Sequence, residues 1–211
     1  MRAALPKTAA GAAVATLIAA LVGGVLAGVL YLFTPWWPGE GPLDARVLTA
    51  GPINSPRQDQ PWTGTNAWFL CTQGADVELE SVRVLTSGSA RDVGAGVQII
   101  SPGDTGGQQI INAQGTPPDF PEPYARPWRE AGLLGRYVEV AGAAVTLPCD
   151  DSDEAYDEAP MPGLLIHATV GAERGSVGPI EVTYRAGLRT CTTTLARRIE
   201  LCGYEEPRRR C

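Results

Sequence analysis

The chain has 211 residues, enough for one domain of ordinary size with extensions, and its formal net charge is −6. Its 25 glycines and 18 prolines exceed average usage, which predicts many turns and few helices. All 23 acidic residues and 15 of the 17 basic residues follow residue 34, so this part of the chain carries a net charge of −8. Such an acidic balance argues against nucleic acid and anionic lipid surfaces as partners.

The N-terminal region predicts a membrane anchor. Residues 1–8 hold both N-terminal bases, and residues 9–33, "AAGAAVATLIAALVGGVLAGVLYLF", hold no charge. A helix rising about 1.5 Å per residue spans roughly 37 Å over this length, which crosses a hydrocarbon core of about 30 Å with some tilt. The positive-inside rule places residues 1–8 in the cytoplasm and the rest of the chain outside the cell. The alternative is a signal peptide cleaved near Val25-Leu26-Ala27, which also exports the rest of the chain.

Small residues on the predicted anchor suggest a surface for helix pairing. Gly24 and Gly28 have the Gly-xxx-Gly spacing, and Ala20 precedes Gly24 by four residues. Small side chains let two membrane helices approach closely and gain van der Waals contact. We therefore expect Ala20, Gly24 and Gly28 to face another helix if the anchor pairs, although a segment rich in Ala and Gly also produces this spacing by chance.

Residues 34–62 predict a stiff spacer, and residues 63–203 a β-rich domain. The spacer is rich in Pro and Gly, with an edge strand near Ala45–Leu48. In the domain, short apolar or alternating runs predict strands, and the run at 77–85 predicts a bulge near Ser81-Val82. The expected strands cover residues 66–71, 77–85, 96–100, 108–111, two short runs within 135–148, 163–170, and a hairpin over 180–195. Residues 204–211 form a polar tail.

The predicted hairpin shows the clearest alternation in the chain. Ile180, Val182 and Tyr184 share one face, polar residues share the other, and Ala186-Gly187 is the expected turn. A period of two is what a half-buried antiparallel hairpin requires. Short strands separated by turns every eight to twelve residues predict an antiparallel β-sandwich.

The five cysteines all lie in the predicted exported part, where an oxidising compartment favours disulfides. The odd number leaves at least one thiol free or paired with another molecule, and Cys211, the last residue, is our choice. An extended chain would hold Cys191 and Cys202 roughly 36 Å apart, far beyond the roughly 7 Å that a disulfide allows. Either the chain folds back near residues 196–198, or each cysteine joins the hairpin to another strand. We expect the second arrangement with Cys71 and Cys149 as partners, in a pairing that the sequence leaves open.

A family resemblance follows from the order of four pieces: "ADVELESVRVL", "MPGLLIHATVG", "GPIEVTYRAGLRT" and "IELC". The sequence resembles a group of actinobacterial single-pass membrane-anchored proteins of unknown function, over roughly residues 66–202. The resemblance implies an N-terminal anchor, a spacer and an Ig-like β-sandwich ectodomain. It carries no catalytic residues and implies no cofactor.

Two features of the sequence are candidates for chemistry, an acidic run and a single histidine. Residues 150–159 hold six carboxylates, and Asp151, Asp153 and Asp157 are candidate oxygen ligands for a divalent metal, although a solvated acidic loop is the favoured interpretation. His167 is the only histidine and is interpreted as a structural residue of its strand. Because no Gly-x-Ser-x-Gly motif or phosphate-binding loop is present, we expect a protein that is not an enzyme.

Three aromatic residues between prolines form a second candidate for binding. Phe120, Tyr124 and Trp128 either present a rigid surface to a partner or fold over the sandwich as a lid, and the lid is favoured. The sequence thus predicts a membrane-anchored binding or accessory module for a protein partner or a second copy in the cell envelope. The alternative is an envelope protein that binds metal or a small ligand through residues 150–159.

Overall fold

The structure is a computed structural model that describes residues 41–47, 60–104, 110, 112–118, 133–149 and 160–205. Within these ranges the chain forms β-strands and their connections and contains no helix, which confirms a mainly β protein. No described segment is a helix that could cross a bilayer. The predicted anchor at 9–33 and most of the predicted spacer lie outside the described residues.

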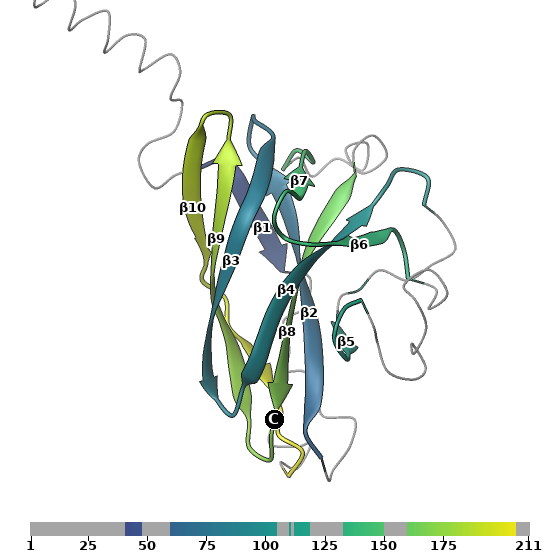
Figure 1. The fold of residues 1–211 in the computed structure, drawn as a ribbon, viewed down its shortest axis with the longest axis vertical. Helices are drawn as coiled ribbons and strands as arrows, with labels where there is room; N and C mark the ends of the chain where they lie inside the picture. The colour runs from purple at the N-terminus through teal and green to yellow at the C-terminus, as the bar shows by residue number, and fades with distance from the viewer. Residues whose placement is uncertain are drawn as a thin grey trace, which may run out of the picture. The chain divides into compact units, whose positions relative to one another are not determined.

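The described strands form two antiparallel sheets (Figure 1). The first sheet has the order β1-β2-β8-β4-β6, with β5 also paired to β2; its strands are β1 (Leu43–Val47), β2 (Trp62–Thr72), β4 (Arg91–Ile100), β5 (Asn112–Gln114), β6 (Arg136–Val138) and β8 (Met161–Val170). The second sheet has the order β10-β9-β3-β7, with β11 also paired to β9; its strands are β3 (Val77–Gly88), β7 (Ala144–Val145), β9 (Gly175–Ala186), β10 (Arg189–Leu195) and β11 (Ile199–Leu201).

The two sheets enclose the main core. Along β9 the burial pattern alternates, so Ile180, Val182 and Tyr184 are fully buried while the residues between them are partly exposed. Trp68 of β2 and Leu164 of β8 are fully buried too, and they lie side by side in register. Burying a side chain of this size stabilises a fold by about 1.5–3 kcal/mol, so these positions are the main source of stability.

Several predicted strands are confirmed. The strand expected at 163–170 is β8, which lies between β2 and β4 in the first sheet. The edge strand expected near Ala45 is β1, and its pairing with β2 brings part of the predicted spacer into the sandwich. The bulge expected near Ser81 is a register shift between Leu79 and Ser81.

One predicted strand lies mostly outside the described residues, and one predicted turn is wrong. Of the strand expected at 108–111 the structure describes only Ile110, which is not in a strand and whose N–H donates to the side chain of Gln98. The turn of the hairpin is Gly187-Leu188 instead of Ala186-Gly187. Ala186 is still buried as the last residue of β9, and Gly187 adopts a φ of 61°, which glycine tolerates best.

Candidate functional surfaces

A disulfide closes one end of the sandwich. Cys71 of β2 is bonded to Cys149, 78 residues further along the chain. The neighbouring backbone is paired as well, because Thr72 N–H donates to Leu147 O at 2.7 Å and Cys149 N–H donates to Thr72 O at 2.9 Å. The bond therefore ties β2 to the segment that runs from β6 in the first sheet through β7 in the second. Both residues are disulfide-bonded as predicted, but the expectation that they pair with Cys191 and Cys202 is wrong, because they are bonded to each other.

The carboxylate of Asp44 lies beside this disulfide. Its oxygen and the two sulfurs lie within 4.8 Å of one another, which is the spacing of a three-ligand metal site. A cysteine binds metal as a thiolate, but here the two sulfurs are bonded to each other in a disulfide. The oxidised structure therefore offers a metal only the exposed Asp44 at this position.

The outer face of the first sheet is covered by a segment that we call the cover, described at Ile110, residues 112–118 and residues 133–135. Gln98 of β4, which is 1 % exposed, bonds both parts of it. Its amide nitrogen donates to Leu134 O at 2.9 Å, and its oxygen accepts the N–H of Ile110 at 3.2 Å. Thr65 Oγ1 of β2 donates to Gly115 O at 2.6 Å. Buried polar side chains thus fix the cover to the sheet.

A small second core lies beneath the cover. Ala67 of β2, Leu165 of β8 and Ile110 are buried together, and Ala113, Leu133 and Tyr137 pack against them. The aromatic residues of the predicted partner-binding loop, Phe120, Tyr124 and Trp128, lie outside the described residues.

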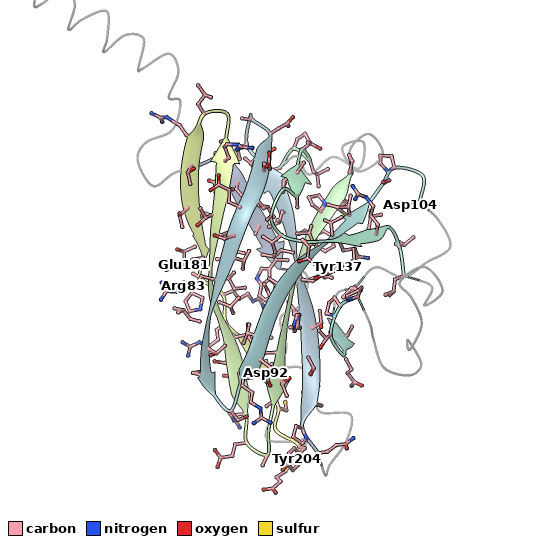
Figure 2. All side chains as sticks on the ribbon, in the orientation of Figure 1. Arg83, Asp92, Asp104, Tyr137, Glu181 and Tyr204 are labelled. Carbon is pink, nitrogen blue, oxygen red and sulfur yellow. A yellow bond between two sulfur atoms is a disulfide. The ribbon has the colours of Figure 1, made fainter. Side chains whose placement is uncertain are left out.

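Two glycines of β4 make room for two rings on the same face. A Cβ at Gly94 would overlap the imidazole of His167, and a Cβ at Gly96 would overlap the ring of Tyr137. Tyr137 is labelled in Figure 2, where it lies beside β4. Near the start of β4 the pairing with β8 shifts register between Arg91 and Gly94, and Asp92 adopts a φ of 50° there. The sequence analysis did not single out Gly94 and Gly96. Their alternation with larger residues in "DVGAGVQ" is the feature that could have indicated them.

His167 is half-buried in this position. Burial lowers the pKa of His167 from its ordinary value of 6.5, so the imidazole is neutral at neutral pH. Its Nδ1 is buried and has no hydrogen-bond partner among the described residues. Burial also raises the pKa of Tyr137, and the charge of Glu139 adds to this shift. The position of His167 on a packed strand face agrees with the structural role predicted for it.

The outer face of the second sheet is polar. Cross-strand ion pairs join Arg83 to Glu181 at 3.3 Å and Arg185 to Glu78 at 2.7 Å, and all four side chains are at least one-third exposed. Figure 2 shows Arg83 and Glu181 together on this side of the molecule. Exposed pairs of this kind stabilise a fold by about 0–1 kcal/mol each, so they mainly keep the face soluble.

The edge of the second sheet at β10 is open in the described structure. β10 forms the outer strand next to β9, at the left margin of Figure 1. A two-residue hairpin is closed by hydrogen bonds between its flanking residues, here Ala186 and Arg189, and the pattern then alternates. The backbone groups of Cys191, Thr193 and Leu195 therefore face β9. Those of Thr190, Thr192 and Thr194 face away from the sheet, where no described strand pairs with them.

Cys191 corrects one prediction about disulfides. It is a free thiol, so the expectation that it joins the hairpin to another strand is wrong. Its neighbour across the pair is Tyr184, and both side chains lie on the inner face of the sheet, where no other described cysteine is in reach. Burial raises the pKa of Tyr184, and the nearby Leu43 backbone reduces that shift. Cys202 belongs to a disulfide, as predicted, but its partner is neither Cys71 nor Cys149.

The remaining predicted sites lie outside the described residues. They are the candidate metal ligands Asp151, Asp153 and Asp157, the helix-pairing residues Ala20, Gly24 and Gly28, and the terminal thiol of Cys211. No family model matches the chain, and neither a curated protein nor a solved structure is significantly similar to it. The resemblance to actinobacterial membrane-anchored proteins therefore stays a prediction.

Proposed function

We propose that this chain is a non-catalytic binding module of the cell envelope. Residues 9–33 anchor it in the membrane, and an Ig-like β-sandwich outside the cell binds a protein partner. The partner adds an extended strand to the sheet at β10. The open edge of β10 is the observation on which this proposal rests, because unpaired backbone N–H and C=O groups are a template for another strand.

Two further observations support the proposal. The disulfide between Cys71 and Cys149 favours an oxidising compartment, in agreement with export of the domain. The uncharged run of residues 9–33 is long enough to cross a bilayer.

The binding edge has the composition of a strand that accepts a partner. Natural edge strands avoid pairing by being short, or by carrying Lys, Pro or a bulge. β10 has seven residues, an unbroken register with β9, and neither Lys nor Pro in its sequence RTCTTTL. The other edge of the same sheet is β7, which has two residues.

A photo-crosslinking amino acid placed at Thr192 in the full-length chain tests the proposal in the cells that produce it. The matched control carries the same amino acid at Ala144, an exposed residue of β7 at the opposite edge. We expect discrete crosslinked protein species from position 192 and none from position 144. Equal labelling from both positions, or none from either, would remove the basis for strand addition at β10.

A further inference from the structure

We propose that the strand added to β10 comes from β10 of a second copy of this chain, in antiparallel orientation across a two-fold axis. This inference rests on the proposed function, because it names the partner at the same edge. The second sheet would then continue from one copy into the next through a β10–β10 pair. The argument uses the register, the side chains and the charges of residues 189–195.

The register follows from which backbone groups are free. Only Thr190, Thr192 and Thr194 direct their N–H and C=O groups away from β9, so these residues must face the same residues of the second copy. The alignment that uses all three places Thr192 opposite Thr192 of the second copy. Thr190 then faces Thr194 in both directions. In this alignment every free backbone group of the strand is paired.

The side chains fit this alignment. On the outer face it pairs threonine with threonine, which is a favourable cross-strand combination. The one charged residue of β10, Arg189, comes opposite Leu195, so two like charges do not face each other. Four neighbouring charges of the outer face form two ion pairs, Arg83 with Glu181 and Arg185 with Glu78, and Glu80 accepts from Thr190 Oγ1 at 3.5 Å. The two ion pairs carry no net charge beside the proposed interface.

β10 is also the longest edge strand of the described sheets. The other strands at sheet edges are β1 with five residues, β5, β6 and β11 with three each, and β7 with two. Parts of β3 and β4 also have no described strand on their far side, but register shifts interrupt both strands, as in protected edges. An edge of seven residues without a protecting bulge favours aggregation unless another strand pairs with it. Closed pairing between two copies removes that edge, since a two-fold interface uses the same surface on both chains.

The alignment makes a geometric prediction about cysteine. Cys191 faces Thr193 of the second copy as a pair without hydrogen bonds, with Cα atoms about 4.5 Å apart, within the range for a disulfide. The two Cys191 residues lie roughly 8 Å apart, too far to bond, because they are offset by two residues along the strands. The variant Thr193→Cys should therefore form a covalent dimer, and the native chain should not form one through Cys191.

The experiment uses full-length protein in its membrane, treated with oxidised glutathione and separated without reductant. We expect a covalent dimer for Thr193→Cys, formed as the two thiols exchange with glutathione disulfide and release two molecules of glutathione. Native protein sets the baseline, which includes any dimer joined through Cys211, and neither Leu195→Cys nor the double variant Cys191→Ala/Thr193→Cys should exceed that baseline. In that double variant the two introduced cysteines are again offset by two residues and cannot meet.

A second pair of variants tests the backbone. Thr192→Pro removes an N–H that faces away from β9, so it should abolish the crosslink of Thr193→Cys while the β9 pairing is retained. Thr192→Val keeps the N–H and should leave the crosslink intact. Self-pairing in this alignment would be overturned if Thr193→Cys formed no more covalent dimer than native protein does. It would also be overturned if Leu195→Cys formed as much covalent dimer as Thr193→Cys. If Thr192 then crosslinks to a different protein, strand addition at β10 still holds and only the identity of the partner is wrong.

Discussion

The disulfide between Cys71 and Cys149 should contribute a large share of the stability of the sandwich. The two residues are 78 positions apart, and a cross-link that closes a loop of this length lowers the entropy of the unfolded chain. The chain-entropy relation gives about 4.5 kcal/mol at 25 °C for this loop. Single domains are stable by about 5–15 kcal/mol in total, so the double variant Cys71→Ala/Cys149→Ala should be close to its folding limit.

Urea denaturation followed by tryptophan fluorescence measures this effect, since Trp68 is fully buried in the core. With a slope of roughly 2 kcal/mol per molar urea, we expect the midpoint to fall by about 2 M in the double variant. The control is Cys191→Ala, which removes a half-buried free thiol and should change the free energy of unfolding by less than about 1 kcal/mol.

A loss below about 2 kcal/mol in the double variant, with an unchanged slope, would refute the reasoning. It would mean that the unfolded chain already holds the two segments together, or that the backbone bonds around Thr72 suffice to keep them together. An effect of Cys191→Ala as large as that of the double variant would also refute it.

Three further predictions concern the outer face of the first sheet, and each is measured by urea denaturation. Gln98→Leu should destabilise by about 2–4 kcal/mol, because the cover loses two bonds and keeps buried groups without partners; no change would mean that the cover is held by apolar contacts alone. Gly96→Ala should cost about 1–3 kcal/mol because its Cβ overlaps Tyr137, whereas the control Gly163→Ala meets only ordinary contacts at 3.9 Å. Because burial lowers the pKa of His167, the unfolded chain takes up the proton first. The free energy of unfolding should therefore fall as the pH drops below about 6.5 and not change through this group above it, and His167→Gln should lack this component of the slope; an identical slope in the variant would contradict the assignment.

Sequence alternation was sufficient to predict the strands that form the main core. Ile180, Val182 and Tyr184 share a face because a strand places every second side chain on one side, and burial decides which side. The apolar run of β8 predicted a central strand because both of its faces are covered, one by the second sheet and one by the cover. A pattern of this kind is local, and it can be read without knowledge of the partners.

Contacts between distant segments could not be predicted in the same way. The pairing of Cys71 with Cys149 depends on a segment that passes from β6 to β7, and nothing in the neighbouring residues specifies that path. The N–H of Ile110 donates to the side chain of Gln98 on β4, a contact that local alternation does not specify. Cys191 resembled a structural cysteine in the sequence, but its place on an edge strand leaves it without a partner cysteine among the described residues.

The two outer faces of the sandwich explain why binding is proposed at an edge. On the first sheet, Ala67, Leu165 and the two glycines of β4 leave a shallow apolar surface, which the cover already occupies. On the second sheet, exposed pairs of arginine and glutamate side chains make the outer face polar. A partner that docked on either described face would have to displace the cover or desolvate ion pairs, both of which oppose binding. Strand addition at β10 requires neither, because it only exchanges water for backbone hydrogen bonds at Thr190, Thr192 and Thr194.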